Sequence, residues 1–283
     1  MTKFVVGIGS QRAGSTLLHK ILSECTDIFM HPVKELHYYD TLYNVRNPSV
    51  LIEYSKRQLD RELDRLVDAR HHGYINKRYK CYIRANKLLA VTPVNQINFI
   101  DLFRPCVMSS EFLGEITPEY MILPEEGVAK MAQDLGRDTK IILISRDPVD
   151  RFISAFKLLK NYTNPQYDST HFSRDLEETL ETMPTWIEQQ KQLSDYETAL
   201  AKYKRHFDQV LFLSFEEMIR DTEKLKQQLE TFLGMTLDNV KYQQVFNQKV
   251  NAIGETAGIS ENTLEALNVM FQMQKQFLEN CFG

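Results

Sequence analysis

The chain has 283 residues, of which 43% are hydrophobic and 25% charged, the composition of an ordinary soluble globular protein. This length predicts one domain, or one domain with an insertion. The net charge of -4 argues against general nucleic-acid binding, which needs a basic surface. No apolar run reaches the ~20 residues of a membrane span, and the N-terminal run is too short for a signal peptide. The cysteines lack the spacing of a zinc or redox motif, which predicts reduced thiols in a cytoplasmic protein: Cys25, Cys81, Cys106 and Cys281.

A strand, a glycine-containing loop and a helix are predicted at the start of the chain. Phe4–Ile8 is a short apolar run typical of a buried strand in a parallel sheet. Apolar residues then recur at helical spacing from Leu17 to Cys25. This order places backbone N–H groups and the positive end of a helix on an anion; an ordinary tight turn is the alternative. The candidate phosphate-binding residues are Gly9, Ser10, Gln11, Arg12, Ala13, Gly14, Ser15 and Thr16.

The loop differs from the phosphate loop of NTPases at one decisive position. It keeps two glycines and a terminal threonine, but Ser15 stands where those enzymes have the lysine that reaches the β- and γ-phosphates. The cation of this loop is Arg12 instead. We therefore expect the loop to bind a phosphate group, but not a nucleoside triphosphate with its magnesium ion.

The segment around Glu35 and His37 brings an acid close to an imidazole. Residues 34–39 alternate like a strand, which would place Glu35, His37 and Tyr39 on one face. Glu35 and His37 would then be neighbours in a site. The alternative is a surface carboxylate beside a core histidine.

A charged, helical region is predicted next. Residues 54–70 are expected to form a largely solvated helix with a narrow apolar stripe of Leu59, Leu63 and Leu66. Basic residues then alternate with tyrosines over residues 71–87, either as a rim for an anionic acceptor or as plain exposed surface. We expect residues 44–110 to form a helical, basic insertion that contributes to acceptor binding.

A second anion-binding motif is predicted after the strand Lys140–Ser145. This strand runs directly into Arg146, and Pro148 suits the first turn of a following helix, which places Ser154 about two turns along. Arg146 and Ser154 could then bind one anion, through charge-assisted hydrogen bonds and a hydroxyl. A surface arginine with a buried serine is the alternative.

The fold class follows from strands that alternate with helices. Residues 156–203 are mostly helical in pattern, and the lone Trp186 is predicted to lie in the core. A third strand, Val210–Ser214, precedes a helix that ends at Gly234. This pattern predicts an α/β fold with a central parallel sheet flanked by helices, a P-loop-like three-layer sandwich. Ligands of such sheets bind beyond the carboxyl ends of the strands.

Together, the motifs resemble those of sulfotransferases that use 3′-phosphoadenosine 5′-phosphosulfate (PAPS). Gly9–Leu17 resembles the 5′-phosphosulfate loop of that family, Arg146–Ser154 its 3′-phosphate motif, and Ser214–Met235 its late strand and helix. The resemblance implies a single sulfotransferase domain over residues 1–283, with PAPS as donor substrate. No metal is required for this chemistry, and no cluster of metal ligands is visible in the sequence. Lys249 lies where related enzymes close a basic loop over the 3′-phosphate.

The segment His31–Asp40 is similar to the Glu-x-His-aromatic-aromatic-Asp signature of the heparan-type glycan sulfotransferases. This resemblance implies that Glu35 is the base, with His37 and Asp40 as its supports. The acceptor hydroxyl must lose a proton as it attacks sulfur, and the leaving phosphate oxygen gains a charge that Arg12 would stabilise.

Two positions depart from the pattern of the family. Many members have lysine at the position of Arg12, and arginine keeps the charge but donates no proton at neutral pH. The heparan-type enzymes carry a lysine before the Thr117–Pro118 turn, where this chain has Ile116. The second departure argues against a heparan-like acceptor.

The sequence therefore predicts an enzyme that transfers a sulfuryl group from PAPS to an acceptor hydroxyl. A glycan hydroxyl is the first choice of acceptor, and a small alcohol, a lipid or a carrier-bound hydroxyl is the alternative. Two other classes of protein stay open: a P-loop kinase or NTPase, which would need Mg-ATP, and a module that binds the nucleotide without turnover.

Overall fold

The structure, a computed structural model, describes residues 2–67, 76–107, 110–164, 166–247 and 258–283. The candidate phosphate ligand Lys249 lies outside the described residues, as do residues 68–75, which belong to the predicted charged helix and basic region.

Five parallel strands form the central sheet, in the order β2-β3-β1-β4-β5. Their bounds are Lys3–Gly9 for β1, Phe29–Met30 for β2, Phe112–Ile116 for β3, Lys140–Ser145 for β4 and Gln209–Ser214 for β5. The three predicted strands are thus confirmed as β1, β4 and β5. The sequence did not reveal β2, which has only two residues, or β3, whose pattern is interrupted by the buried Glu115.

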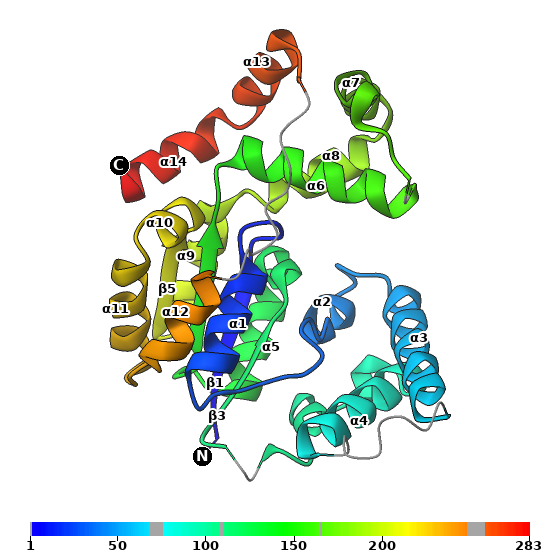
Figure 1. The fold of residues 1–283 in the computed structure, drawn as a ribbon, viewed down its shortest axis with the longest axis vertical. Helices are drawn as coiled ribbons and strands as arrows, with labels where there is room; N and C mark the ends of the chain where they lie inside the picture. The colour runs from blue at the N-terminus through cyan, green and yellow to red at the C-terminus, as the bar shows by residue number, and fades with distance from the viewer. Residues whose placement is uncertain (1, 68–75, 108–109, 165, 248–257) are drawn as a thin grey trace.

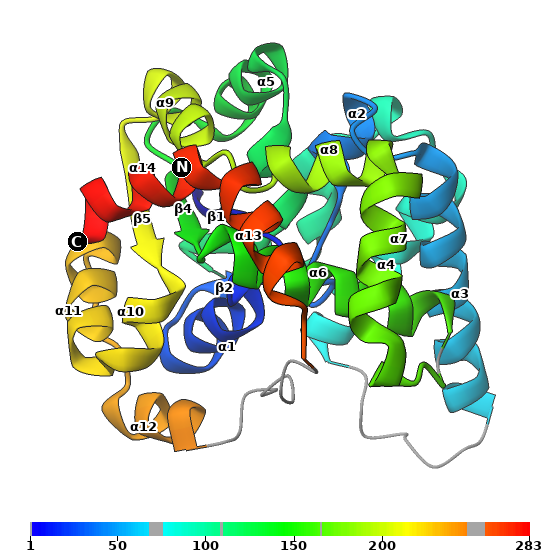
Figure 2. The ribbon, with the colours of Figure 1, turned by 90° about the horizontal axis from the view of Figure 1, so that it is seen from above.

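Two layers of helices cover the sheet (Figures 1 and 2), and alternate residues of the central strand β1 pack against them. Phe4, Val6 and Ile8 belong to the core shared with α5 (Glu125–Leu135) and α9 (Tyr196–His206). On the opposite face, Val5 packs with α1 (Ser15–Cys25), α11 (Thr222–Leu233) and α12 (Asn239–Asn247). This arrangement is the three-layer α/β sandwich that the sequence predicted.

A third cluster of apolar residues lies over the helices that follow β4. It joins α6 (Pro148–Thr163), α7 (Phe172–Thr182), α8 (Pro184–Gln192) and α13 (Glu261–Met270). Trp186 is half-buried there and packs against Phe152 and Phe156. The chain ends in α14 (Gln272–Phe282), and the short elements η6 (Ser169–His171) and α10 (Phe215–Arg220) complete this half.

Helices α3 (Pro48–Val67) and α4 (Lys77–Val91) lie side by side at one side of the molecule (Figure 1). In the chain, α2 (Tyr38–Leu42) precedes α3, while η2 (Val94–Gln96) and η3 (Phe99–Phe103) follow α4. The short η5 (Pro118–Ile122) follows β3 and contacts β1 and α2. Residues of α3, α4 and η3 contribute to the same core as β1, including Leu51, Leu89 and Phe103.

The predicted apolar stripe of the charged helix is a partial error. Leu63 and Leu66 are 59% and 41% exposed, and Leu59 is only partly buried. They line a groove with α4 instead of entering the core. The buried residues of the helix are Leu51, Ser55 and Glu62 instead, and the helix contacts both α4 and α2.

Among the helices of the described residues, none combines the length and apolarity needed to cross a bilayer. The four cysteines all lie in described segments and form no disulfide.

Candidate active site

The predicted phosphate-binding loop, Gly9–Thr16, is called the phosphate loop below. It lies at the carboxyl end of β1 and leads directly into α1. Gly14 is the N-cap of α1 with φ 90, a left-handed conformation that L side chains rarely adopt. A Cβ at this position would lie 2.7 Å from the Phe215 ring. The loop is therefore pressed against α10, and the glycine is required by both conformation and space.

Hydrogen bonds hold the loop at its first residues and leave its last residues open. The backbone N–H of Ser10 donates to Ile144 O at 2.8 Å, and its buried hydroxyl donates to Leu193 O at 2.6 Å. Within the described part of the chain, no hydrogen bond uses the N–H groups of Gly14, Ser15 or Thr16. The start of α1 thus offers free donors and the positive end of the helix dipole to an anion.

The two predicted anion-binding motifs meet in space. Arg12 Nε donates to Ser154 Oγ at 3.0 Å, and Arg146 Nη1 donates to the carbonyl oxygen of Arg12 at 3.0 Å. The Arg146 guanidinium also lies over the Phe215 ring, 5.1 Å from its centroid. The structure therefore brings Arg12, Arg146 and Ser154 together, although the two arginines are 134 residues apart.

No ion pair among the described residues neutralises either arginine. Burial, with the neighbouring charge of Arg146, lowers the pKa of Arg12. Two partly desolvated cations side by side repel each other, and a bound anion relieves this repulsion. The arrangement can hold a multiply charged anion.

A third arginine of the same motif has a structural role that the sequence did not reveal. Arg151 is fully buried and donates to Ser194 Oγ, Gln190 Oε1 and Gln190 O at 2.8, 3.1 and 2.7 Å. It braces the turn that carries Leu193, the acceptor of the Ser10 hydroxyl. The helical spacing between Arg151 and Ser154 would have placed both on one face of α6, but nothing in the sequence identified the distant partners.

The predicted strand at residues 34–39 is wrong. Residues 32–37 form an irregular segment, and α2 begins at Tyr38. The backbone N–H groups of Leu36 and His37 donate to the side chains of Glu115 and Thr117, at 3.3 and 3.4 Å. These side-chain acceptors replace a sheet partner, and His37 turns into α2 with φ 49.

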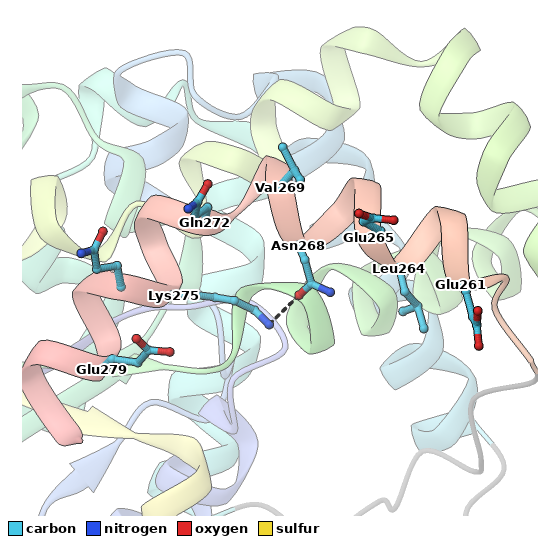
Figure 3. Close-up of a pocket in the computed structure, with 9 residues that line it drawn as sticks. Glu261, Leu264, Glu265, Asn268, Val269, Gln272, Lys275 and Glu279 are labelled. Atoms are coloured by element: carbon cyan, nitrogen blue, oxygen red, sulfur yellow. Dashed lines mark hydrogen bonds between the residues drawn. The ribbon is translucent and has the colours of Figure 1, made fainter.

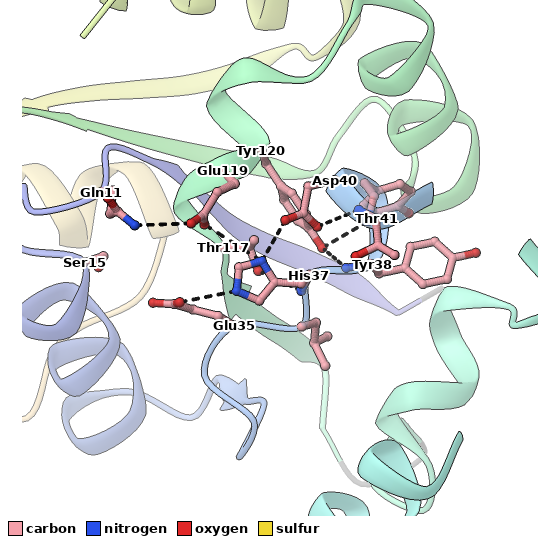
Figure 4. A network of polar contacts seen from close by, with 12 residues as sticks. Gln11, Ser15, Glu35, His37, Tyr38, Asp40, Thr41, Thr117, Glu119 and Tyr120 are labelled. Atoms are coloured by element: carbon pink, nitrogen blue, oxygen red, sulfur yellow. Dashed lines mark hydrogen bonds and ion pairs between the residues drawn. The ribbon is translucent and has the colours of Figure 1, made fainter. Parts of the chain in front are cut away.

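Glu35 and His37 are nevertheless neighbours (Figure 4). The distance from His37 Nε2 to Glu35 Oε2 is 3.5 Å, and Asp40 Oδ2 lies 2.7 Å from His37 Nδ1. Tyr39, expected on the same face, is instead fully buried and stacks on Phe99. The prediction that an acid and an imidazole are adjacent is confirmed, although the backbone follows a different path from the predicted strand.

The electrostatic state of this pair follows from its partners. Burial alone would lower the pKa of His37, but hydrogen bonds with Asp40 and Glu35 and the charge of Glu119 raise it to about 10. Burial alone would raise the pKa of Glu35, but the hydrogen bond with His37 and the nearby Lys34 ammonium lower it to about 2. At neutral pH the site therefore holds an imidazolium at His37 beside an ionised carboxylate at Glu35.

Glu119 is a site residue that the sequence reasoning missed. It lies on η5, directly after the predicted Thr117–Pro118 turn, and its Oε1 accepts from Gln11 Nε2 at 3.4 Å. Its Oε2 is buried without a hydrogen-bond partner in the described structure, 3.9 Å from His37 Nδ1. Burial, with the charges of Glu35 and Asp40, raises its pKa. Glu119 thus links the phosphate loop to the Glu35–His37 pair.

Three possible metal ligands converge here, which the sequence spacing did not show. Ligand atoms of Glu35, His37 and Glu119 lie within 4.8 Å of one another. The raised pKa of His37 means that its imidazole keeps both protons at neutral pH, and a protonated imidazole has no lone pair for a metal. A metal ion bound here would therefore have to displace a proton from His37.

A separate groove of about 720 Å³ lies on α13 and α14 (Figure 3). Carboxylates of Glu261, Glu265 and Glu279 line it, and its one lysine, Lys275, contacts Asn268 and Asp147. Such a surface repels polyanions. It is not a candidate for the nucleotide.

A comparison with known protein families gives a match over most of the chain. The family model described as "Sulfotransferase family" matches residues 4–239. The chain belongs to the sulfotransferase family. Mouse heparan sulfate glucosamine 3-O-sulfotransferase 3B1 is 27% identical to this chain over 188 residues, which cover 60% of the chain and 46% of the relative. The human 3B1 protein is 30% identical over 135 residues, which cover 46% and 33%. The chain thus spans less than half the length of these curated relatives.

Solved structures share the fold of this chain. A sulfotransferase from Alicyclobacillus acidocaldarius has a TM-score of 0.60 at 19% identity and covers 99% of this chain and 95% of its own. The sulfotransferase domain from the curacin biosynthetic pathway has a TM-score of 0.53 at 15% identity, with coverages of 94% and 86%. At these identities the likeness establishes the architecture alone.

Proposed function

We propose that this protein transfers a sulfuryl group from PAPS to an acceptor hydroxyl. The observation that carries the proposal is the meeting of Arg12, Arg146 and Ser154 at the ends of β1 and β4. Neither arginine has a carboxylate partner among the described ion pairs. The Glu35–His37 pair is connected to the loop through Glu119, which accepts a hydrogen bond from Gln11 and lies 3.9 Å from His37 Nδ1. A doubly phosphorylated nucleotide has the charges that such a site needs.

In this proposal the two ends of the donor bind at different motifs. The N–H groups at the start of α1, with the hydroxyls of Ser15 and Thr16, hold the 5′-phosphate. Arg146 and Ser154 hold the 3′-phosphate, and Lys249 is proposed to close over it. Arg12 Nε donates a hydrogen bond to Ser154 Oγ, so we infer that the Arg12 side chain turns toward the leaving oxygen when the donor occupies the loop.

The chemical step then needs one proton acceptor and one electrostatic stabiliser. The acceptor oxygen attacks sulfur, its proton passes to Glu35, and the bond between sulfur and the bridging phosphate oxygen breaks. The electron pair of that bond stays on the phosphate oxygen, next to Arg12. His37 and Asp40 hold Glu35 in place. No step calls for a metal.

A glycan is the proposed acceptor class. A cleft of about 390 Å³ lies between α3 and α4 and is lined by Arg61, Arg65 and Arg78. Pro32, three residues before Glu35 in the chain, also lines it. Arg78 Nη1 also donates a hydrogen bond to Met30 O at 2.9 Å. These cations suit an acidic sugar, and we propose that the insertion at residues 44–110 receives the acceptor through this cleft.

A second acceptor class is favoured by a different observation. A larger groove of about 1440 Å³ between α3 and α4 is walled by apolar side chains, and cations lie among its lining residues: Lys80, Arg84, Lys87 and Arg104. It shares Glu62 and Tyr79 with the basic cleft. An amphiphile with an anionic group could place its apolar chain in the groove and its hydroxyl toward Glu35.

Thermal shift separates the proposed donor from the nucleotide of a kinase. We expect 3′-phosphoadenosine 5′-phosphate (PAP) to raise the melting temperature, because a ligand that binds only the folded state stabilises it. Mg-ATP should give a smaller shift, since it lacks the 3′-phosphate. A shift with Mg-ATP alone would support the P-loop NTPase class instead.

Transfer from labelled PAPS tests catalysis and the acceptor together. The panel contains a heparan sulfate oligosaccharide, a neutral oligosaccharide and a long-chain alcohol. Glu35→Gln should lower kcat by about 10²–10⁴-fold, the usual contribution of a general base, with PAP affinity retained. PAP binding without transfer to any member of the panel, in wild type and variant alike, would favour a binding module.

We also propose a cytoplasmic location, on the ground that four cysteines without a disulfide suit a reducing compartment. Thiol titration of the protein isolated from its native cells checks this. Fewer than four reactive thiols after denaturation would contradict it.

A further inference from the structure

Lys34 lies between the proposed base and the phosphate loop. Its Nζ is 2.6 Å from Glu35 Oε1 and 3.4 Å from Ser15 Oγ. Its side chain is 30% exposed, so part of it remains accessible to a ligand. The carbonyl oxygen of Lys34 accepts from the N–H of Ile116 at 3.4 Å, which ties this residue to the end of β3.

The surroundings leave this ammonium group as the cation nearest the base. His37 is held by Asp40 and faces Glu35 from the other side. His19, which feels the charge of Lys34, has its pKa lowered to about 4, chiefly by burial, and is neutral at pH 7. Ile116, where heparan-type enzymes carry a lysine, is 1% exposed and packed in the core beneath α1. It offers no charge to the site.

A cation at this place resolves a difficulty in the proposed reaction. The sulfuryl group of the donor is anionic, and an ionised Glu35 close to it repels it. A cation that bridges the two removes this repulsion and stabilises the oxygens of the sulfuryl group during transfer. Ser15 is the first residue of α1 and lies where the proposed 5′-phosphosulfate binds, so a shift of a flexible side chain would bring Nζ to the sulfuryl oxygens.

We propose that Lys34 is a catalytic residue that pairs with Glu35 in the free enzyme and contacts the sulfuryl oxygens of the bound donor. The inference rests on the proposed sulfuryl transfer. Lys34 keeps its proton throughout: the acceptor oxygen–sulfur bond forms, the bond from sulfur to the bridging oxygen breaks with its electron pair on the phosphate of PAP, and Glu35 takes the acceptor proton.

The proposal distinguishes chemistry from donor binding. We expect Lys34→Met to lower kcat by about 10²–10³-fold, the usual effect of removing one group that stabilises transition-state charge. The Kd for PAP, which lacks the sulfuryl group, should change less than about three-fold because the lost interaction is made in the transition state. Lys34→Arg keeps the charge in a different shape and should lose about ten-fold.

The pH profile supplies a second readout. Lys34 is one of the groups that lower the pKa of Glu35, so its removal raises that pKa. Since the base must be ionised, activity is lost as pH falls through its pKa, and the acid limb of kcat/KM should move to higher pH in Lys34→Met. Lys204→Met, an exposed lysine on α9, is the matched control and should behave as wild type in every measurement.

The experiment uses the full chain, labelled PAPS and the best acceptor of the panel above, with PAP titrated by calorimetry. Equal kcat in Lys34→Met and wild type would overturn the inference. An equal loss of PAP affinity and kcat would also overturn it, because Lys34 would then only hold the nucleotide. Failure of the wild type to bind PAP or to transfer sulfuryl would instead count against the proposed function.

Discussion

Replacement of Arg146 by alanine tests the recognition of the 3′-phosphate. One terminal nitrogen of Arg146 donates to Arg12 O at 3.0 Å, and no described ion pair occupies the rest of the guanidinium. Four of its five N–H donors therefore remain, and two of them suffice for a bidentate contact with a phosphate, without an ion-paired carboxylate to displace. At about 1.5 kcal/mol for each charge-assisted hydrogen bond, the low end of the usual range, their loss costs about 3 kcal/mol. That corresponds to about 10²-fold in the Kd for PAP.

Calorimetry with PAP and with adenosine 5′-phosphate provides the assay. The second nucleotide lacks the 3′-phosphate, so its affinity should hardly change in Arg146→Ala, and the preference of the wild type for PAP should collapse. Ser154→Ala should weaken PAP binding only about five-fold, because a neutral hydroxyl contributes about 1 kcal/mol. Arg57→Ala, an exposed arginine on α3, is the control for net charge. Equal losses for both nucleotides in Arg146→Ala would refute the assignment of this residue to the 3′-phosphate.

Three further predictions concern the scaffold of the site. The pKa of His37 is raised to about 10 in the folded protein. The protonated imidazole therefore stabilises the fold fully below the pKa of the unfolded chain, near 6.5, and this stabilisation is lost as pH rises toward 10. Urea unfolding should show this loss of stability with pH in wild type and not in His37→Gln, and parallel curves for the two proteins would contradict it. Arg151→Met strands the buried partners of three hydrogen bonds and should lower the free energy of unfolding by about 3 kcal/mol, as measured by chemical denaturation; a loss below 1 kcal/mol would show that the brace is dispensable. Gly14→Ala forces a Cβ to 2.7 Å from Phe215 in a left-handed conformation, so we expect a cost of about 1–3 kcal/mol and weaker PAP binding in calorimetry, and an unchanged Kd would mean that the loop adapts.

The local patterns that the sequence carries were enough for the framework of the site. Buried strands in a parallel sheet are continuous apolar runs, and this made β1, β4 and β5 visible. The glycine loop before α1 and the Arg146–Pro148 start of α6 follow from backbone chemistry that acts over a few residues. The nearness of Glu35 and His37 was also predicted, but for a wrong reason. Two residues this close in the chain meet along many backbone paths.

Long-range contacts decided what the patterns could not show. Residues 32–37 can follow an irregular path because Glu115 and Thr117 accept backbone hydrogen bonds from them. These acceptors lie in and directly after β3, a strand that the sequence did not reveal. Glu119 enters the site only because η5 folds back beside the phosphate loop. No periodicity within the segment itself encodes a partner 80 residues away.

The sequence by itself determined which groups are available: an anion-binding loop without the NTPase lysine, an arginine after a second strand, and an acid near an imidazole. Only the tertiary structure decided the charge state of these groups and which other groups surround them. It placed two unneutralised guanidinium groups together and an ammonium group between Glu35 and the loop. The physical reason is that charge and desolvation depend on every neighbour in space, whereas a sequence motif lists only neighbours along the chain.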